Sequence, residues 1–260
     1  MDQKLRAAAR QFLPTGLRKP LGALAGTINE RIVLPFLGLL FDLKGGRFYA
    51  GGCSFDIPKD ITNRAFRACF LNRTYEKYEL QLIPRFVQPQ DRVVELGACI
   101  GVISCVTNRL LADRSQHLVV EANPFCLPAL YRNRDLNQAG FLIEHCVVDL
   151  KPEVTFFLNR FITGSSLHSE TSRPVRLPGK SLRQLERERG PFTVLIIDIE
   201  GSEREVFEDS ADLLKAYRLV IAELHEWAIG ADGVEHCRQM LRNAGLTFVE
   251  RADIVEVWRR

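Results

Sequence analysis

The sequence lacks the features that mark secreted and membrane-spanning proteins. Its longest apolar run, IVLPFLGLLF at 32–41, contains Pro35 and has about half of the roughly 20 residues that a membrane-spanning helix requires. The start of the chain does not combine basic residues, an apolar stretch and a small-residue cleavage site, as a signal peptide would. We therefore expect this run to form a buried or interfacial helix that does not span a bilayer.

The sequence also has little net charge and no cysteine spacing typical of a redox pair or a zinc site. The formal net charge is only +3, and no basic stripe is interleaved with aromatic residues, so nucleic acid is not expected as a partner. The seven cysteines form no C-x-x-C pair and no zinc spacing. We expect buried, reduced thiols, which favour the cytoplasm. A weakly basic N-terminal arm leaves peripheral contact with an anionic membrane open, although most such arms are simply solvated.

The order of apolar runs divides the chain into two parts. Residues 1–60 are expected to form an accessory segment of helices followed by a glycine-flanked hairpin at 45–58. Residues 61–260 are expected to form an α/β domain, because short apolar runs alternate with amphipathic segments, as in a parallel sheet covered on both faces. The apolar runs are 92–96, 117–121, 141–148, 193–199 and 218–224. The end of the chain, 246–258, predicts an antiparallel hairpin that closes the sheet.

The stretch VVELGACIG (93–101) predicts a buried strand that turns sharply into a helix. Gly97 permits a turn that a β-carbon would block, and Gly101 lets the new helix pack close to its strand. In doubly wound sheets, ligands bind beyond the carboxyl ends of the strands. We therefore expect the Glu95 carboxylate to point into a ligand crevice, although a tight turn without a ligand would use the same glycines.

A second acidic residue favours a ligand at this turn. HLVVEANP places Glu121 at the end of the next strand, 24 positions after Gly97, which is near the spacing at which an acidic side chain reaches ribose hydroxyls. The glycines follow G-x-x-x-G and not G-x-G-x-x-G, so no pyrophosphate cradle is evident. The pattern therefore suits a ligand with a ribose and an ammonium group and no phosphates.

Two further strand ends carry acidic groups and a histidine. IDIEGSE places Asp198 and Glu200 on the same side of a strand end, and AELHE does the same for Glu223 and His225. If these strands are neighbours, the four side chains converge. His225 or Asp198 could then act as a general base, and a divalent metal bound by Asp198, Glu200 and His225 is an alternative.

The longest irregular stretch, roughly 159–180, contains one more candidate, His168 in GSSLHSE. Long loops in compact domains are often functional. His168 is therefore a candidate substrate contact, and the alternative is a solvent-exposed loop histidine.

Taken together, ELGACIG, EANP and LIIDIEGSEREVF resemble the FkbM-type methyltransferases, which have the class I S-adenosylmethionine-dependent fold. The resemblance extends over roughly 75–225 and implies a mostly parallel seven-stranded, Rossmann-like sheet with a C-terminal antiparallel hairpin. It also implies S-adenosyl-L-methionine as the cofactor. The family commonly has a lysine before the acidic motif, where this chain has isoleucine, so a mechanism that relies on that lysine is in doubt.

The resemblance also implies roles for individual residues. The methionine portion of the cofactor is expected at the glycine turn, the ribose at the second strand end and the adenine after the third strand. Tyr75, with Glu76, matches a Tyr-Glu pair that precedes the first strand in the family, and Asp198 is expected beside the cofactor. The residues expected at the three cofactor portions are Glu95, Gly97, Ala98 and Gly101 (methionine), Glu121 and Ala122 (ribose), and Cys146 and Val147 (adenine).

The expected function is O-methylation of a hydroxyl on a sugar, glycolipid or secondary metabolite; this acceptor class comes from the resemblance alone. A base must take the hydroxyl proton during the attack, and Asp198, His225 and Glu200 are the candidates, with Glu223 and His168 expected to bind substrate. The alternatives are an N-directed or macromolecule-directed methyltransferase and a non-catalytic cofactor-binding or scaffold module. A divalent metal and a homo-oligomer are both compatible with the sequence.

Overall fold

The structure is a computed structural model that describes residues 29–158, 162 and 173–260. Contacts between Cα atoms divide the chain into two compact units. The small unit contains residues 1–46 and 62–75, and the large unit contains residues 47–61 and 76–260. This division differs from the boundary expected after residue 60, because the predicted hairpin belongs to the large unit and a helical segment beyond it belongs to the small unit.

The described part of the small unit contains two helices, α3 (Leu34–Leu43) and α4 (Arg64–Leu71), with a short π-helical turn, η1 (Asn29–Val33), before α3. Pro35 lies in the first turn of α3, where a missing N–H costs nothing, so it begins the helix without breaking it. Phe41 and Phe70 stack across the two helices with their centroids 5.7 Å apart. None of the described helices has the length and apolarity needed to cross a membrane.

The large unit contains the predicted doubly wound sheet. Its strand order is β11-β12-β10-β9-β3-β4-β5. The strands from β10 to β5 pair in parallel, and the C-terminal strands β11 and β12 form the expected antiparallel hairpin. The strand bounds are β3 (Val93–Leu96), β4 (His117–Val120), β5 (Leu142–Glu144), β9 (Val194–Ile197), β10 (Leu219–Glu223), β11 (Thr247–Ala252) and β12 (Val255–Arg259). The expected α/β fold class is confirmed.

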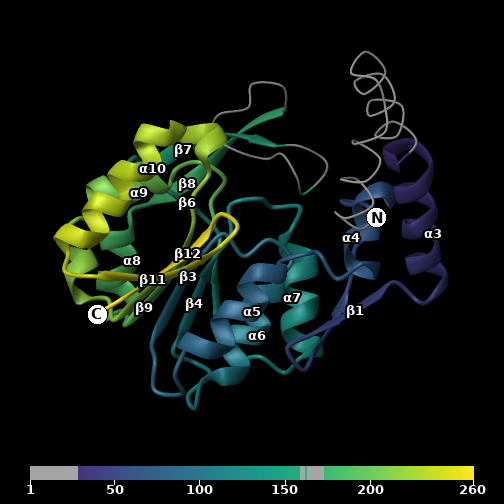
Figure 1. The fold of residues 1–260 in the computed structure, drawn as a ribbon, viewed down its shortest axis with the longest axis horizontal. Helices are drawn as coiled ribbons and strands as arrows, with labels where there is room; N and C mark the ends of the chain where they lie inside the picture. The colour runs from purple at the N-terminus through teal and green to yellow at the C-terminus, as the bar shows by residue number, and fades with distance from the viewer. Residues whose placement is uncertain (1–28, 159–161, 163–172) are drawn as a thin grey trace, which may run out of the picture. The chain divides into compact units, whose positions relative to one another are not determined.

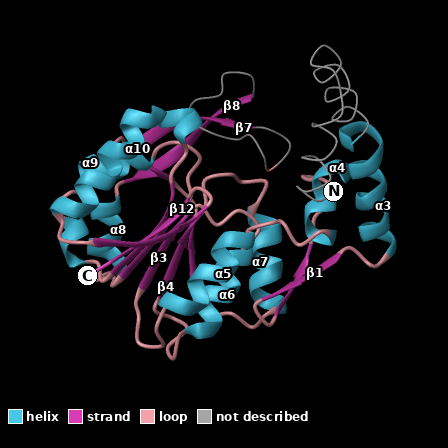
Figure 2. Cartoon of the chain, in the orientation of Figure 1, coloured by secondary structure: helices cyan, strands magenta, loops and turns pink. Residues whose placement is uncertain are grey.

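Helices cover both faces of this sheet (Figures 1 and 2). On one face lie α5 (Lys77–Phe86), α6 (Val102–Leu110) and α7 (Leu127–Leu136). On the other lie α8 (Leu182–Arg189), α9 (Glu203–Asp209), the 3-10 turn η2 (Leu213–Ala216) and α10 (Glu226–Asn243). The central strands β3, β4 and β9 are buried along their whole length. Each buried Val, Leu or Ile contributes about 1.5–3 kcal/mol, which explains why these runs are apolar without alternation.

The third apolar run, 141–148, does not form one strand as expected. Its first part is β5, but the chain leaves the main sheet at His145, and β6 (Val147–Val148) pairs with β8 (Arg173–Lys180). With β7 (Glu153–Leu158), these strands make a separate sheet of order β6-β8-β7. Phe141, Val147 and Val148 are buried, whereas β5 itself is partly exposed, with Leu142 at 43%. The apolar run is nevertheless continuous in sequence, so hydrophobicity alone does not reveal the break.

The predicted hairpin is present as β1 (Arg47–Ala50) and β2 (Cys53–Asp56), joined through Gly51 and Gly52 with φ of +55° and +75°. Its edge is anchored to α7 by asparagine side chains. The Asp56 N–H donates to Asn133 Oδ1 at 2.8 Å, and the Ser54 N–H donates to Asn137 Oδ1 at 2.9 Å. These bonds satisfy backbone groups that an edge strand would otherwise leave open.

Candidate active site

The turn between β3 and α6 is held by the end of β9. Gly97 has φ of +92°, and its N–H donates to the carbonyl of Val120 on the neighbouring strand at 3.0 Å. A β-carbon at Gly97 would lie 1.6 Å from the carbonyl oxygen of Asp198. Glycine is therefore required here both for its conformation and because the chain after β9 passes directly against it.

Gly101 has a different neighbour from the one that the sequence suggested. It has φ of +82° and precedes the first residue of α6. A β-carbon there would lie 2.6 Å from Cδ1 of Leu130, which belongs to α7. The close approach is thus between the start of α6 and the next helix, and not between α6 and its own strand.

Glu121, at the end of β4, organises the turn that follows β3. One carboxylate oxygen accepts the Cys99 N–H and the other accepts the Asn123 N–H, each at 2.6 Å. Burial raises the pKa of Glu121, and hydrogen bonds from backbone N–H groups partly offset this, to give a pKa of about 7. The N–H groups of Ala98 and Ala122 also act on this carboxylate, and its contact with ribose hydroxyls remains a prediction.

Glu95 does not point its carboxylate into an open crevice. Its side chain is 1% exposed, and both of its oxygens have partners inside the protein. Ser104 Oγ of α6 donates to one at 2.5 Å, and His117 Nε2 of β4 lies 3.1 Å from the other. The alternation of a strand places Glu95 correctly on one face, but the first turn of α6 covers that face.

The other residues expected around the cofactor are mostly in apolar packing. The Cys146 side chain is fully buried in the core between the sheet and α8, and Val147 packs within the small sheet beside the half-buried Ala122. Ala98 is also buried. The expected contacts of these four residues with the cofactor stay predictions.

The second group of candidates converges, because β9 and β10 are parallel neighbours. Asp198, Glu200, Glu223 and His225 lie at the same ends of these strands, as expected. The structure adds carboxylates from α9 and from α5 on the opposite face. We call the whole group the carboxylate cluster: Glu76, Glu79, Asp198, Glu200, Glu203 and Glu223, around His225.

His225 is the centre of this cluster. Its Nδ1 lies 2.8 Å from Glu203 Oε1, and its Nε2 lies 3.4 to 3.7 Å from oxygens of three further carboxylates: Glu223, Asp198 and Glu200. Burial by itself lowers the pKa of His225, but hydrogen bonds to Glu203 and Glu223 and the surrounding negative charge raise it to about 11. His225 therefore holds its proton at neutral pH.

The carboxylates themselves titrate in different directions. Burial raises the pKa of Glu76 and of Asp198 well above their usual range and that of Glu79 to about 8. Burial also acts to raise the pKa of Glu223, but hydrogen bonds with His225 and Glu79 bring it below its usual value. At neutral pH, Glu79 thus carries the proton of its pair with an ionised Glu223.

Two sets of three residues in the cluster could each reach one metal ion. They are the expected set of Asp198, Glu200 and His225, and a second set of Glu76, Glu79 and Glu223; within each set, the ligand atoms lie within 4.8 Å of one another. Sequence reasoning missed Glu79 and the role of Glu203 as the partner of His225. The available signal was Glu79 itself, an acidic residue on the face of α5 that buries Leu82 and Ile83.

Two candidates are not part of this geometry. Tyr75 belongs to the small unit, where its ring lies 4.6 Å from that of Phe70, centroid to centroid. His168 lies outside the described residues. Their expected roles stay predictions.

Comparisons with known proteins give one family match and several distant structural similarities. A family model described as the methyltransferase FkbM domain matches residues 95–248. Fibrillarin from Aeropyrum pernix, solved with natively bound S-adenosyl-L-methionine, is 12% identical over 66% of this chain and 67% of its own, with a TM-score of 0.42. Precorrin-6y C5,15-methyltransferase from Geobacter metallireducens is 10% identical over 78% of this chain and 91% of its own, with a TM-score of 0.43. No curated protein matches the chain in sequence.

Proposed function

This chain belongs to the FkbM methyltransferase family, and we propose that it transfers a methyl group from S-adenosylmethionine to a hydroxyl oxygen of a sugar, glycolipid or secondary metabolite. The observation that carries this proposal is Asp198, whose Oδ1 is buried without a hydrogen-bond partner directly after β9. Buried acids that lack a partner are costly to a fold and cluster at functional sites.

The residues at the strand ends fit the cofactor. Glu121 is a buried carboxylate at the end of β4, the strand end where the resemblance expects the ribose. Six acidic side chains of the carboxylate cluster surround one histidine, and the ionised ones, Glu223 among them, suit the positive charges of the sulfonium and the amino group. When bound, S-adenosylmethionine supplies a methyl group on a positively charged sulfur.

We assign Asp198 as the general base that takes the proton of the acceptor hydroxyl. Burial and the charge of Glu223 raise the pKa of Asp198, while the positive charge of His225 opposes this shift. A carboxylate with a raised pKa is, once ionised, a stronger base than an exposed one. Since His225 already holds a proton, it acts as the cation that keeps neighbouring carboxylates ionised, and Glu203 fixes its orientation through Nδ1.

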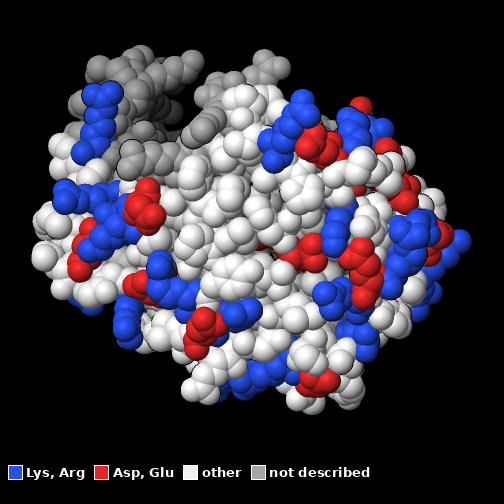
Figure 3. Space-filling view, turned by 180° about the vertical axis from the view of Figure 1, so that it is seen from behind, with Lys and Arg blue, Asp and Glu red and all other residues white. Residues whose placement is uncertain are grey.

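In this proposal the methyl acceptor is a small molecule or a glycan-linked group. Figure 3 shows Lys and Arg side chains interspersed with Asp and Glu over the described part of the face it draws, without a continuous basic stripe. This favours a small-molecule or glycan-linked acceptor over nucleic acid. All seven cysteines are free thiols, and for this reason we place the reaction in the cytoplasm.

Calorimetric titration of S-adenosylhomocysteine into the wild type and Glu121→Ala tests the cofactor site. We expect micromolar binding that the substitution weakens by about 1–3 kcal/mol, because buried hydrogen bonds to the ribose are lost. The control is Glu235→Ala, which removes an exposed carboxylate paired with Arg242 and should leave affinity unchanged. Absence of binding to the wild type would overturn the proposal.

Formation of S-adenosylhomocysteine with a panel of hydroxylated acceptors then tests the chemistry. Asp198→Asn keeps the size of the side chain and removes the base, so we expect turnover to fall by about 10²–10⁴. Turnover that is unaffected by this change would exclude Asp198 as the base.

A further inference from the structure

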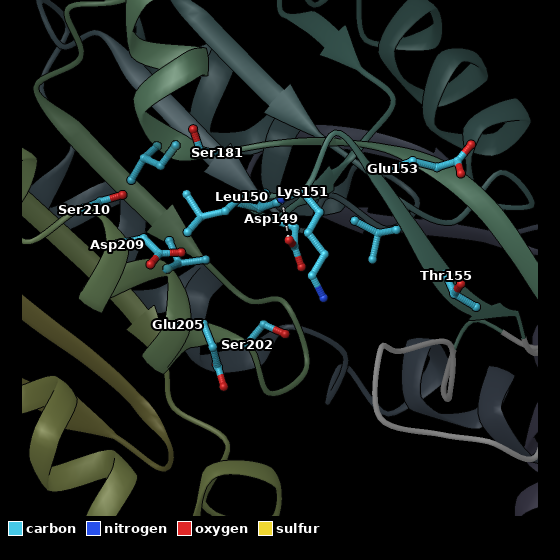
Figure 4. A pocket seen from close by; sticks show the side chains of 14 residues that line it. Asp149, Leu150, Lys151, Glu153, Thr155, Ser181, Ser202, Glu205, Asp209 and Ser210 are labelled. Atoms are coloured by element: carbon cyan, nitrogen blue, oxygen red, sulfur yellow. Dashed lines mark hydrogen bonds between the residues drawn. The ribbon is translucent and has the colours of Figure 1, made fainter.

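A second concave site lies beside the carboxylate cluster. It is a cavity of about 570 Å³ between the small sheet and helices α8 and α9 (Figure 4). Its volume is within the range of pockets that hold small organic ligands. Figure 4 shows Ser202, Glu205, Asp209 and Ser210 on one side, and Asp149, Leu150 and Lys151 beside them.

The cavity adjoins the proposed active site through the start of α9. Ser202 lines the cavity and is two residues after Glu200, so their Cα atoms are at most about 7 Å apart. The neighbouring Glu203 turns instead toward His225, which its Oε1 contacts at 2.8 Å. The first turn of α9 therefore presents one side chain to the cluster and Ser202 and Glu205 to the cavity.

The charge of the cavity is negative and largely uncompensated. Four carboxylates and one ammonium group line it: Asp149, Glu153, Glu205, Asp209 and Lys151. Glu153 pairs with Arg176 at 2.8 Å, but no ion pair among the described residues involves Glu205, Asp209 or Lys151. Glu205 and Asp209 are four residues apart on α9, a spacing at which like charges repel each other.

The remaining lining combines hydroxyl groups with an apolar floor. Ser181, Ser202, Ser210 and Thr155 supply hydroxyls, while Val148, Val154, Leu182 and Val206 are apolar. Burial, followed by the charges of Asp149 and Glu208, raises the pKa of Asp209, which is the response of a carboxylate that lacks a cation beside it. Hydroxyls and carboxylates together bind polyhydroxylated ligands, and excess negative charge selects those that carry an amine.

We propose that this cavity binds the methyl acceptor and that the acceptor is a hydroxylated amine of the amino-sugar class, whose ammonium group lies between Glu205 and Asp209. This deepens the proposed function and rests on it, since it names the acceptor of the same reaction. Ser202 lines the cavity and lies five residues after the last residue of β9, and the proposal requires that a ligand held there present a hydroxyl toward Asp198.

Calorimetry with D-glucosamine and with D-glucose tests the charge selection, using the full chain saturated with S-adenosylhomocysteine. We expect glucosamine to bind at least tenfold more tightly than glucose. The double variant Glu205→Gln/Asp209→Asn should lose this preference. Glu208→Gln is the matched control, because it removes a carboxylate of the same helix that is already paired with Arg204 at 2.8 Å, and its preference should be retained.

Two results would overturn the assignment: equal affinity for the two sugars, or a preference that survives in the double variant. Titration of S-adenosylhomocysteine alone separates this failure from failure of the proposed function. If the cofactor product binds but glucosamine does not, the cavity assignment is wrong and the methyltransferase proposal stands. If S-adenosylhomocysteine does not bind, the proposed function itself is wrong.

Discussion

Carboxylates at two places in the sheet differ in their hydrogen-bond partners: those at the ends of β3 and β4, and those at the ends of β9 and β10. Glu95 and Glu121 are buried, and all four of their oxygens have partners inside the protein. In the carboxylate cluster, buried oxygens of Glu79, Asp198 and Glu203 have no hydrogen-bond partner. Each of these oxygens in the first region has at least one partner inside the protein, whereas the second region contains buried oxygens without a hydrogen bond, which a ligand or a proton would satisfy.

This difference separates carboxylates that stabilise the structure of the site from carboxylates that we expect to take part in proton transfer. A carboxylate with all its partners fixes backbone geometry, as Glu121 does for the turn at Cys99. A crowded group of acids around one histidine instead shifts pKa values in both directions, which is the condition for proton transfer near neutral pH. We therefore expect substitutions in the first region to change stability and affinity, and those in the second to change turnover and pH dependence.

The largest expected effect comes from Gly97→Ala, a substitution in the turn between β3 and α6. The added β-carbon would lie 1.6 Å from a backbone oxygen of Asp198 at a φ of +92°. Because backbone must move to relieve this contact, we expect a loss of at least about 4 kcal/mol in the free energy of unfolding, measured by urea denaturation. Gly230→Ala is the control: its φ is +71°, but a β-carbon there meets nothing within 4 Å. It should cost only about 1–3 kcal/mol, and equal losses would show that the contact with β9 is unimportant.

The second prediction concerns His225 in the cluster. Glu203→Gln removes the carboxylate that contacts Nδ1 at 2.8 Å, and we expect a lower pKa of His225 and a loss of about 3 kcal/mol at pH 7, as for a broken buried ion pair. A histidine pKa raised to about 11 stabilises the fold fully below the unfolded value near 6.5, and this stabilisation is lost as the pH rises toward 11.

The wild type should therefore lose stability between pH 7 and 10, and Glu203→Gln should lose less over the same interval. Denaturation curves at several pH values measure this slope, and imidazole NMR titration measures the pKa directly. A His225 pKa that stays near 11 in the variant would mean that Glu203 does not hold the proton there.

The fold was predictable because its strongest signals are local. The runs that became β3, β4, β9 and β10 are short, apolar and separated by amphipathic helices, and each needs burial on both faces. The run at 141–148 was wrongly predicted to form one strand. Its hydrophobicity is continuous, but the chain changes sheet after Glu144. Which sheet a buried strand joins depends on long-range pairing, and hydrophobic periodicity carries no information about that.

The site was predictable only along single strands. The pattern correctly brought Asp198, Glu200, Glu223 and His225 to neighbouring strand ends, although Glu200 lies beyond β9 with a φ of +57° and not in extended strand geometry. It could not show that α6 covers Glu95, nor that Glu79 of α5 meets Glu223 from more than a hundred residues away. Such contacts arise from helix packing over the sheet, and they also set the pKa of His225.

A smaller effect should distinguish the structural carboxylate Glu121 from the cluster. With a pKa of about 7, it loses its charge as the pH falls, and a protonated carboxyl has one acceptor site fewer for ribose hydroxyls. The affinity for S-adenosylhomocysteine should thus fall by up to about tenfold from pH 8 to pH 6. Glu121→Gln should bind weakly and show a flat pH profile; a slope that persists in this variant would assign the titration to another group.

The smallest expected effect tests whether a proton or a metal balances the cluster. A metal at Asp198, Glu200 and His225 must displace the proton that His225 holds with a pKa of about 11. At pH 7, this competition weakens metal binding by about 10⁴, since the histidine must be neutral to act as a ligand. We therefore expect EDTA to leave turnover within about twofold of its initial value, and added Mn²⁺ to have no effect. If EDTA abolishes turnover and Mn²⁺ restores it, the charge of the cluster is balanced by a metal, and the contrast with the ends of β3 and β4 becomes one between a preformed turn and a metal centre.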